Sequence, residues 1–194
     1  MMTTSFSVVL DACVLVPITL CDTLLSLADR RLFRPLWSDM ILDEMERNAA
    51  AYMIKKGMPS EKALAGAAYR RSQMEASYPE ASVKGYESLI SAMTNELKDR
   101  HVLAAAERGG AQVIVTNNTK DFPRSALDPY SIERKTADEF LIDLLAFDSH
   151  LVLNALQVMT AQKTRPPMLI LEMLQRIGKS APNFAAAVLI HLDS

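Results

Sequence analysis

The stretch "VIVTNNTKDFP", residues 113–123, begins with three apolar residues and then turns abruptly polar. A run that is apolar on both alternating faces is typical of a strand covered by helices on both sides, and such strands belong to parallel sheets. Directly after it come Thr116, Asn117 and Asn118. Asp121 follows three residues later. Parallel sheets bind ligands outside the carboxyl ends of their strands, so the stretch predicts a polar site there.

A second stretch, "FSVVLD" at residues 6–11, has the same character and ends on Asp11. A carboxylate that directly follows a buried strand is unfavourable unless its charge is compensated. The following residues, "ACVLV", include no cationic side chain, and a bound cation is one remedy. Two strands therefore deliver oxygen-bearing side chains to the same edge of the predicted sheet.

Helical patterns separate and follow these strands, which indicates an α/β domain built over a mostly parallel sheet. Ser38 and Ser60 are predicted N-caps of two central helices, and Thr136 with Glu139 forms a predicted capping box. A short third strand is expected just before Thr136. The predicted helices of the second half of the chain span residues 99–108, 137–147, 149–162, 168–177 and 183–192.

The composition is that of an ordinary globular protein, with 194 residues, 49% of them hydrophobic and 23% charged. The net charge of −2 provides no overall basic field, so a nucleic-acid partner would require a local basic patch or bound cations. Cys13 and Cys21 are too few for a disulfide framework and are expected to be reduced thiols in a cytoplasmic protein. We predict no targeting segment and no membrane span.

Acidic residues supply the candidate chemistry. Asp99 lies where a helix begins, and Glu44 lies one turn into the helix that follows Ser38. Taken singly, Asp99 could be an N-cap, Glu44 a surface residue and Asp121 a turn residue. Gathered together with Asp11, such carboxylates would repel one another unless a divalent cation lay between them. Oxygen ligands without clustered His or Cys favour Mg²⁺ or Mn²⁺, which can activate a water for phosphodiester hydrolysis.

Three features together resemble a known family: the strand ending in Asp11, the acidic helix, and the stretches "DRHVLAAA" and "VIVTNNTKDFP". They resemble PIN-domain ribonucleases, the fold of many VapC-type toxins, over roughly residues 8–132. The resemblance implies a three-layer α/β/α fold with a central, mostly parallel sheet. We predict a PIN-like nuclease domain over residues 1–147 and a helical extension over residues 148–194 that packs on or beside it.

The resemblance also implies a set of site residues. The catalytic and metal-binding quartet would be Asp11, Glu44, Asp99 and Asp121, and the residue that positions water or substrate would be Thr116, Asn117 or Asn118. Asp128 is an alternative to Asp121. Asp43 and Glu46 compete with Glu44, which we prefer because Ile41 and Met45 flank its face of the helix.

The function implied by the resemblance is metal-dependent hydrolysis of RNA phosphodiester bonds, with Mg²⁺ or Mn²⁺ as cofactor. It further implies the toxin of a type II toxin–antitoxin pair, with a small antitoxin as partner and no membrane partner; a homodimer is an open alternative. The competing hypothesis is a catalytically inactive PIN-like module that binds RNA or protein. Candidate phosphate-binding residues are Arg30, Arg31, Arg34, Lys98, Arg100, Lys120 and Arg124.

Overall fold

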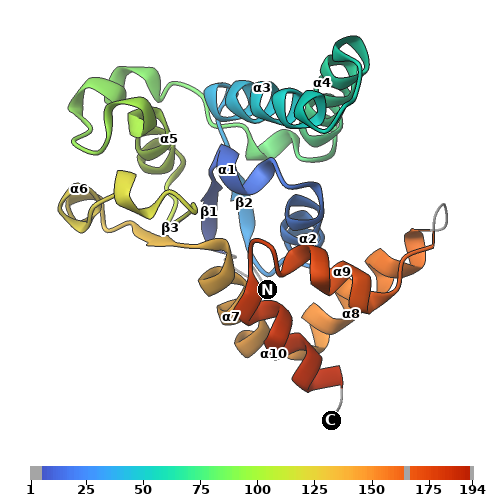
Figure 1. Cartoon of the computed structure of the whole chain (residues 1–194). Helices are drawn as coiled ribbons and strands as arrows, with labels where there is room; N and C mark the ends of the chain where they lie inside the picture. Colours follow the sequence, from blue (N-terminus) through green and yellow to red (C-terminus); the bar gives the residue numbers. More distant parts are fainter. Residues whose placement is uncertain (1–5, 164–166, 193–194) are drawn as a thin grey trace.

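A short parallel sheet forms the centre of the molecule in the computed structural model, which describes residues 6–163 and 167–192 (Figure 1). The strand order is β2-β1-β3-β4, and all three strand pairs are parallel. The strands are β1 (Ser7–Leu10), β2 (Arg34–Leu36), β3 (Val113–Val115) and β4 (Glu133–Lys135). The central strands β1 and β3 are buried along their whole length, which explains their unbroken apolar sequences.

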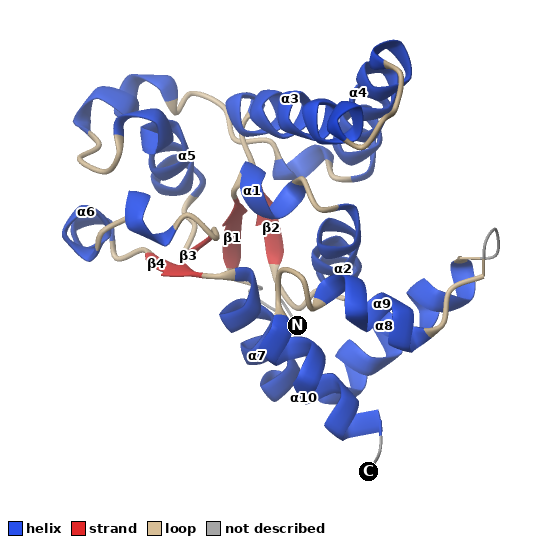
Figure 2. Cartoon of the chain, viewed as in Figure 1, coloured by secondary structure: helices blue, strands red, loops and turns tan. Residues whose placement is uncertain are grey.

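Helices enclose the sheet on both sides and give the three-layer α/β/α fold that was predicted (Figure 2). Helix α2 (Ile18–Asp29) packs against β2, α5 (Arg100–Gly109) packs against β1 and β3, and α7 (Ala137–Phe147) packs against β4. Helices α3 (Asp39–Lys55) and α4 (Ser60–Ser77) form a long hairpin beyond the carboxyl ends of the strands. One continuous hydrophobic core joins these layers.

The predicted helix signals are largely confirmed. Ser38 Oγ accepts a hydrogen bond from the backbone N–H of Ile41 at 3.3 Å, and Thr136 with Glu139 forms the capping box that begins α7. Gly110 ends α5 in the left-handed conformation, with φ of 64°. Ser60 differs from its prediction, because it is the first residue of α4 and Pro59 holds the N-cap position without a side-chain hydrogen bond.

Strand β2 was not predicted from the sequence, and its position in the sheet explains why. It pairs with β1 alone among the named strands, so it lies at the edge of the sheet. Pro35 has no backbone N–H to donate, and an edge strand tolerates this. Beyond it, Trp37 and Ser82 form an isolated parallel bridge. The remaining short elements are α1 (Ala12–Leu15), η1 (Pro79–Ala81), η2 (Glu87–Ala92), η3 (Leu97–Asp99), η4 (Thr119–Asp121), α6 (Arg124–Leu127) and η5 (Asp128–Tyr130).

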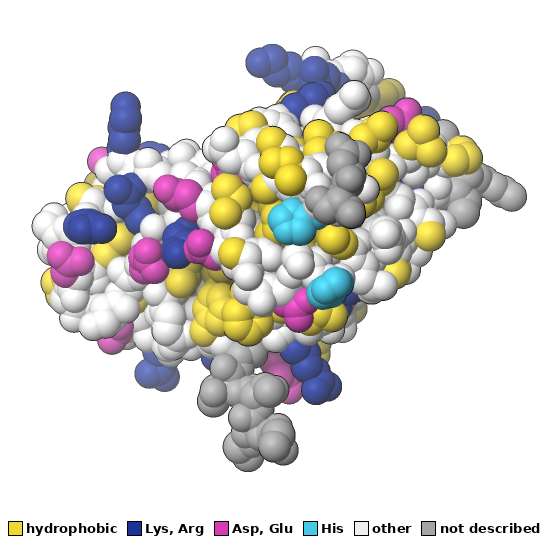
Figure 3. Space-filling model, turned by 90° about the horizontal axis from the view of Figure 1, so that it is seen from below, with side chains coloured by type: hydrophobic (Ala, Val, Ile, Leu, Met, Phe, Trp, Pro, Cys, Tyr) yellow, Lys and Arg dark blue, Asp and Glu magenta, His cyan; other side chains and the backbone are white. Residues whose placement is uncertain are grey.

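The C-terminal part of the chain is helical: α8 (Ser149–Gln162), α9 (Ile170–Ile177) and α10 (Pro182–Leu192). Helix α8 packs against α2 and α7, and α10 packs against α7 and has buried Phe184 and Val188 side chains. These helices also leave apolar side chains at the surface, and Figure 3 shows hydrophobic groups on the lower face of the molecule. A domain boundary between residues 147 and 148 stays a prediction, and residues 1–5, 164–166 and 193–194 of the two predicted domains lie outside the described residues.

Among the described residues, no single helix combines the length and the apolar character needed to cross a membrane. Helices α7 and α8 reach that length and composition only as a pair, with a bend of 115° between them.

Candidate functional site

Two neighbouring strands end at the same rim of the sheet. Asp11 directly follows β1 and Thr116 directly follows β3. The backbone N–H of Asp11 donates to the carbonyl of Val115 at 3.1 Å, which holds the two strand ends side by side. The rim is thus built by the parallel pairing of two strands that lie about a hundred residues apart in the sequence.

The carboxylate of Asp11 is buried, with 2% of the residue exposed, and its charge is compensated by hydrogen bonds. Its Oδ2 accepts from Thr116 Oγ1 at 2.6 Å and from Cys13 Sγ at 3.1 Å. The role of Cys13 was not predicted from the sequence. Its position two residues after Asp11, in the first turn of α1, is the signal that could have revealed it.

Cys13 and Thr116 also organise the loop that follows β3. Cys13 Sγ accepts from the backbone N–H of Asn117 at 3.2 Å, and Thr116 Oγ1 accepts from that of Asn118 at 3.0 Å. The side chain of Asn117 faces the next helix, because its Oδ1 accepts from the N–H of Ala137 at 3.2 Å. Of the three polar residues predicted here, Thr116 contacts the Asp11 carboxylate, Asn117 supports α7, and Asn118 is exposed.

Asp99 lies at the N-cap position of α5, but its side chain makes no capping hydrogen bond. It is 3% exposed, and its Oδ2 is held by an ion pair. The ammonium of Lys98 lies between two carboxylates, with Nζ 3.1 Å from Asp99 Oδ2 and 2.8 Å from Asp121 Oδ2. Asp99 and Asp121 therefore share one cationic side chain.

The pKa values at this rim show that its acids influence one another. Burial raises the pKa of Asp99 to about 6; a hydrogen bond with Asp121 and the charge of Asp11 act in the same direction, against the hydrogen bond and charge of Lys98. The hydrogen bond from Lys98 lowers the pKa of Asp121. Burial, with the charge of Asp11, raises the pKa of the Cys13 thiol to about 12. Asp11, Asp99 and Asp121 thus lie in one electrostatically coupled site.

Glu44 approaches the same site from α3. Its Oε2 lies 3.8 Å from Nε2 of the buried His101, which follows Asp99 by two residues. Burial lowers the pKa of His101, while the charges of Glu44 and Asp11 oppose that shift. The charges of both carboxylates therefore act on the pKa of one imidazole, which indicates that Glu44 and Asp11 lie on the same side of the rim.

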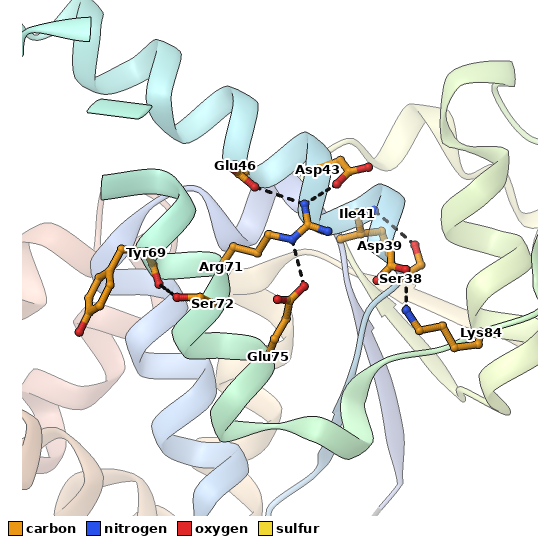
Figure 4. A network of polar contacts seen from close by, with 10 residues as sticks. All are labelled: Ser38, Asp39, Ile41, Asp43, Glu46, Tyr69, Arg71, Ser72, Glu75 and Lys84. Carbon is orange, nitrogen blue, oxygen red and sulfur yellow. Dashed lines mark hydrogen bonds and ion pairs between the residues drawn. The ribbon is translucent and has the colours of Figure 1, made fainter. Parts of the chain in front are cut away.

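The acidic neighbours of Glu44 on α3 point elsewhere. Asp43 and Glu46 both form ion pairs with Arg71 of α4, which also pairs with Glu75 (Figure 4). These contacts hold the α3–α4 hairpin together. The geometry therefore separates Glu44, which faces the rim, from Asp43 and Glu46, which face the other helix of the hairpin.

Asp128 and one of the predicted arginines lie away from the acids. Asp128 is exposed and lines a groove of about 920 Å³ along β4, whereas Asp121 shares Lys98 with Asp99. Arg34 begins β2, at the end of the sheet opposite the rim, where it donates to Ser7 Oγ at 3.0 Å. Asn95, which lies just before η3, is buried and neither of its amide atoms has a hydrogen-bond partner.

The donor atoms of the rim suit a hard divalent cation. The candidate ligands are carboxylate oxygens, and the buried Oδ2 of Asp99 has the Lys98 ammonium, shared with Asp121, as its partner in the place that a cation would take. In residues 6–163 and 167–192, however, no group of three or more His, Cys, Asp or Glu side chains is drawn close enough to hold a metal ion.

Comparisons with known proteins agree with the resemblance seen in the sequence. Residues 7–120, more than half of the chain, match the family described as PIN domain, and residues 137–189 match the family described as VapC50 C-terminal domain. The chain is 44% identical over 102 residues to the Mycobacterium tuberculosis protein named "Putative ribonuclease VapC50". That alignment covers 53% of this chain and 60% of the relative, which is less than two thirds of its length. No solved structure matches the chain.

Proposed function

Because this chain belongs to the PIN-domain family, we propose that it is a metal-dependent endoribonuclease that hydrolyses RNA phosphodiester bonds. The observation that carries the proposal is that the buried carboxylate of Asp99 shares the Lys98 ammonium with Asp121 and lies near enough to Asp11 for that charge to act on its pKa. The similarity to a relative named as a ribonuclease supports the same activity.

In this proposal the metal ligands are Asp11, Glu44, Asp99 and Asp121, and the metal is Mg²⁺ or Mn²⁺. A divalent cation held there supplies Lewis acidity, which activates water and neutralises charge on a phosphodiester. The chain's own part is to hold the ligands in place. The hydroxyl of Thr116 and the thiol of Cys13 fix Asp11 through their hydrogen bonds to Oδ2.

Positive side chains beside the acids would hold the RNA backbone. Lys98 and Lys120 are exposed, and both act on Asp121: Lys98 by a direct ion pair and Lys120 through its charge alone. Lysines at such a rim attract phosphates and make binding strongly dependent on salt. RNA is therefore the proposed substrate, although the chain as a whole carries a slight negative charge.

The biological role we propose is that of the toxin in a type II toxin–antitoxin pair, acting in the cytoplasm and held inactive by a small antitoxin protein. The matches to the PIN domain family and to the family described as VapC50 C-terminal domain, on successive parts of the chain, support this role.

The activity is tested with purified protein and single-stranded RNA in the presence of Mg²⁺ or Mn²⁺. We expect Asp11→Asn and Asp99→Asn to lower the cleavage rate by roughly a hundredfold or more, since charge stabilisation at a reacting centre has effects of that size. Glu44→Gln should reduce cleavage strongly, whereas Asp43→Asn, its neighbour on α3, should leave it unchanged. Asp128→Asn is the matched control for Asp121→Asn.

Three outcomes would contradict the proposal. Cleavage that persists in EDTA would exclude a metal-dependent reaction. Equal loss of activity in Asp43→Asn and Glu44→Gln would show that α3 matters only for stability. An unmodified protein that binds RNA but neither cleaves it nor binds a divalent cation would establish the inactive PIN-like module instead.

A further inference from the structure

Lys98 occupies an unusual position between two acids. Its Nζ lies 2.8 Å from Asp121 Oδ2 and 3.1 Å from Asp99 Oδ2, yet 63% of its side chain is exposed to solvent. The Asp99 side chain is 5% exposed and that of Asp121 is 24% exposed. One exposed ammonium thus offsets part of the negative charge of two carboxylates, of which one is almost fully buried.

The positive side chains nearby do not share this position. Arg100 Nε donates to the backbone carbonyl of Asn95 at 3.2 Å, and Lys120 influences Asp121 through its charge without an ion pair in the part of the chain that the structure describes. The Asp11 carboxylate is held by two uncharged donors. The Lys98 ammonium therefore occupies the position between Asp99 and Asp121 that a bound metal cation would take.

We infer that Lys98 is an exchangeable internal counter-ion of this site. Without a divalent cation its ammonium holds Asp99 and Asp121 together; when a divalent cation binds, the ammonium leaves the position between them. The exchange is favoured because a dication carries twice the charge of an ammonium and binds several oxygens at once. An exposed ion pair contributes little to stability, so its loss is readily offset. The inference rests on the proposed metal-dependent function.

The exchange has a consequence for metal affinity. Any divalent cation must displace Lys98, so the ammonium weakens metal binding by the free energy of the contacts it loses. Removal of the ammonium should therefore destabilise the metal-free protein and strengthen metal binding. A lysine that only supported the local fold would show the first effect without the second.

The first measurement is the melting temperature in EDTA at neutral pH. Lys98→Met should lower it by about 2–4 °C, the shift expected for about 1 kcal/mol in a chain of this size. Lys98→Arg should restore most of the loss, because it returns the charge. Lys120→Met is the matched control, an exposed lysine near the same carboxylate, and should change little. In an Asp99→Asn background the effect of Lys98→Met should shrink.

The second measurement is calorimetric titration with MnCl₂. Lys98→Met should bind Mn²⁺ roughly two to five times more tightly than the unmodified protein, which is the factor that corresponds to the loss of an exposed ion pair. Lys120→Met should bind more tightly by a smaller factor. Because the readout is binding, it does not depend on RNA cleavage.

The results separate the two claims. Equal Mn²⁺ affinity in Lys98→Met and the unmodified protein would overturn the role of Lys98 and leave the metal site intact. Weaker Mn²⁺ binding in Lys98→Met would also overturn it, since the lysine would then support the ligands. If neither protein binds Mn²⁺, the metal site is wrong, and the proposed function falls with it.

Discussion

The acidic rim has an Asp11 half and an Asp99 half, which also includes Asp121. The negative charges of the two halves are stabilised in different ways. On one half, Asp11 is buried where β1 ends and accepts hydrogen bonds from the buried Thr116 and the half-buried Cys13. On the other half, Asp99 and Asp121 share the exposed ammonium of Lys98. The first half depends on neutral donors that cannot leave without disturbing the fold. The second depends on a side chain that is largely exposed to solvent.

This difference indicates that the two halves of the rim have different roles. A carboxylate fixed by two short contacts presents its remaining oxygen in one orientation, which is preorganisation of a ligand. A carboxylate paired with an exposed ammonium can exchange that partner when another cation binds. We therefore expect changes on the Asp11 half to act on the rigidity of the site, and changes on the Asp99 half to act on its response to pH and metal.

The largest effect is expected on the Asp99 half, from pH. The pKa of Asp99 is raised to about 6 in the folded protein from an ordinary value of 3.8, mainly by burial. As pH rises from about 4 to about 6, the unfolded chain releases a proton that the folded protein still binds, so stability falls through this window. A shift of this size corresponds to a loss on the order of 3 kcal/mol above pH 6.

Asp99→Asn tests this, since an amide cannot ionise. In EDTA it should be more stable than the unmodified protein above pH 6 and equally stable near pH 4, as measured by chemical denaturation across the pH range. The pH dependence contributed by Asp121 has the opposite sign. Lys98 lowers the pKa of Asp121, so the stability that this carboxylate contributes is lost as pH falls. If the difference between Asp99→Asn and the unmodified protein did not change with pH, the charge on Asp99 would not be destabilising.

The next effect is expected on the Asp11 half. Thr116→Val removes the hydroxyl that donates to Asp11 Oδ2 at 2.6 Å while it keeps the shape of the side chain. An under-bonded buried carboxylate should lower stability by about 1–2 kcal/mol, or a few degrees in melting temperature. Thr116→Ser, which keeps the hydroxyl, should recover most of it. A melting temperature that is unchanged in Thr116→Val would show that Asp11 does not depend on this donor.

The main features of the Asp11 half could be predicted from the sequence. Strands β1 and β3 are buried on both faces, so their apolar runs are unbroken, and the polar residue that ends each run marks the rim. Parallel pairing then places Asp11 beside Thr116 without further information. The hydroxyl of Thr116 was recognised only as one of three polar candidates, because sequence spacing does not show which side chain turns inward.

The Asp99 half was harder to predict, for physical reasons. Lys98 was counted among several basic residues beside the acids, but a shared ammonium depends on the side-chain direction at η3, which spacing does not fix. Strand β2 was missed because Pro35 and the arginine before it are tolerated at a sheet edge. Arg34 was placed beside its neighbours in sequence, whereas the direction of β2 carries it to the opposite end of the sheet.

The smallest effect is expected from Cys13, and it tests whether the Asp11 half is as rigid as its contacts indicate. Its thiol donates to Asp11 Oδ2 and accepts from the N–H of Asn117, so it joins α1 to the loop after β3. A thiol is a weak donor, and Cys13→Ala should lower stability by only about 0.5 kcal/mol, while Cys13→Ser should be close to neutral. Because burial and the charge of Asp11 raise the thiol pKa to about 12, native Cys13 should also resist alkylation by iodoacetamide at pH 8, as followed by mass spectrometry. Rapid labelling of Cys13 in the folded protein would mean that the loop opens readily, and the contrast between a fixed and an exchangeable half would then fail.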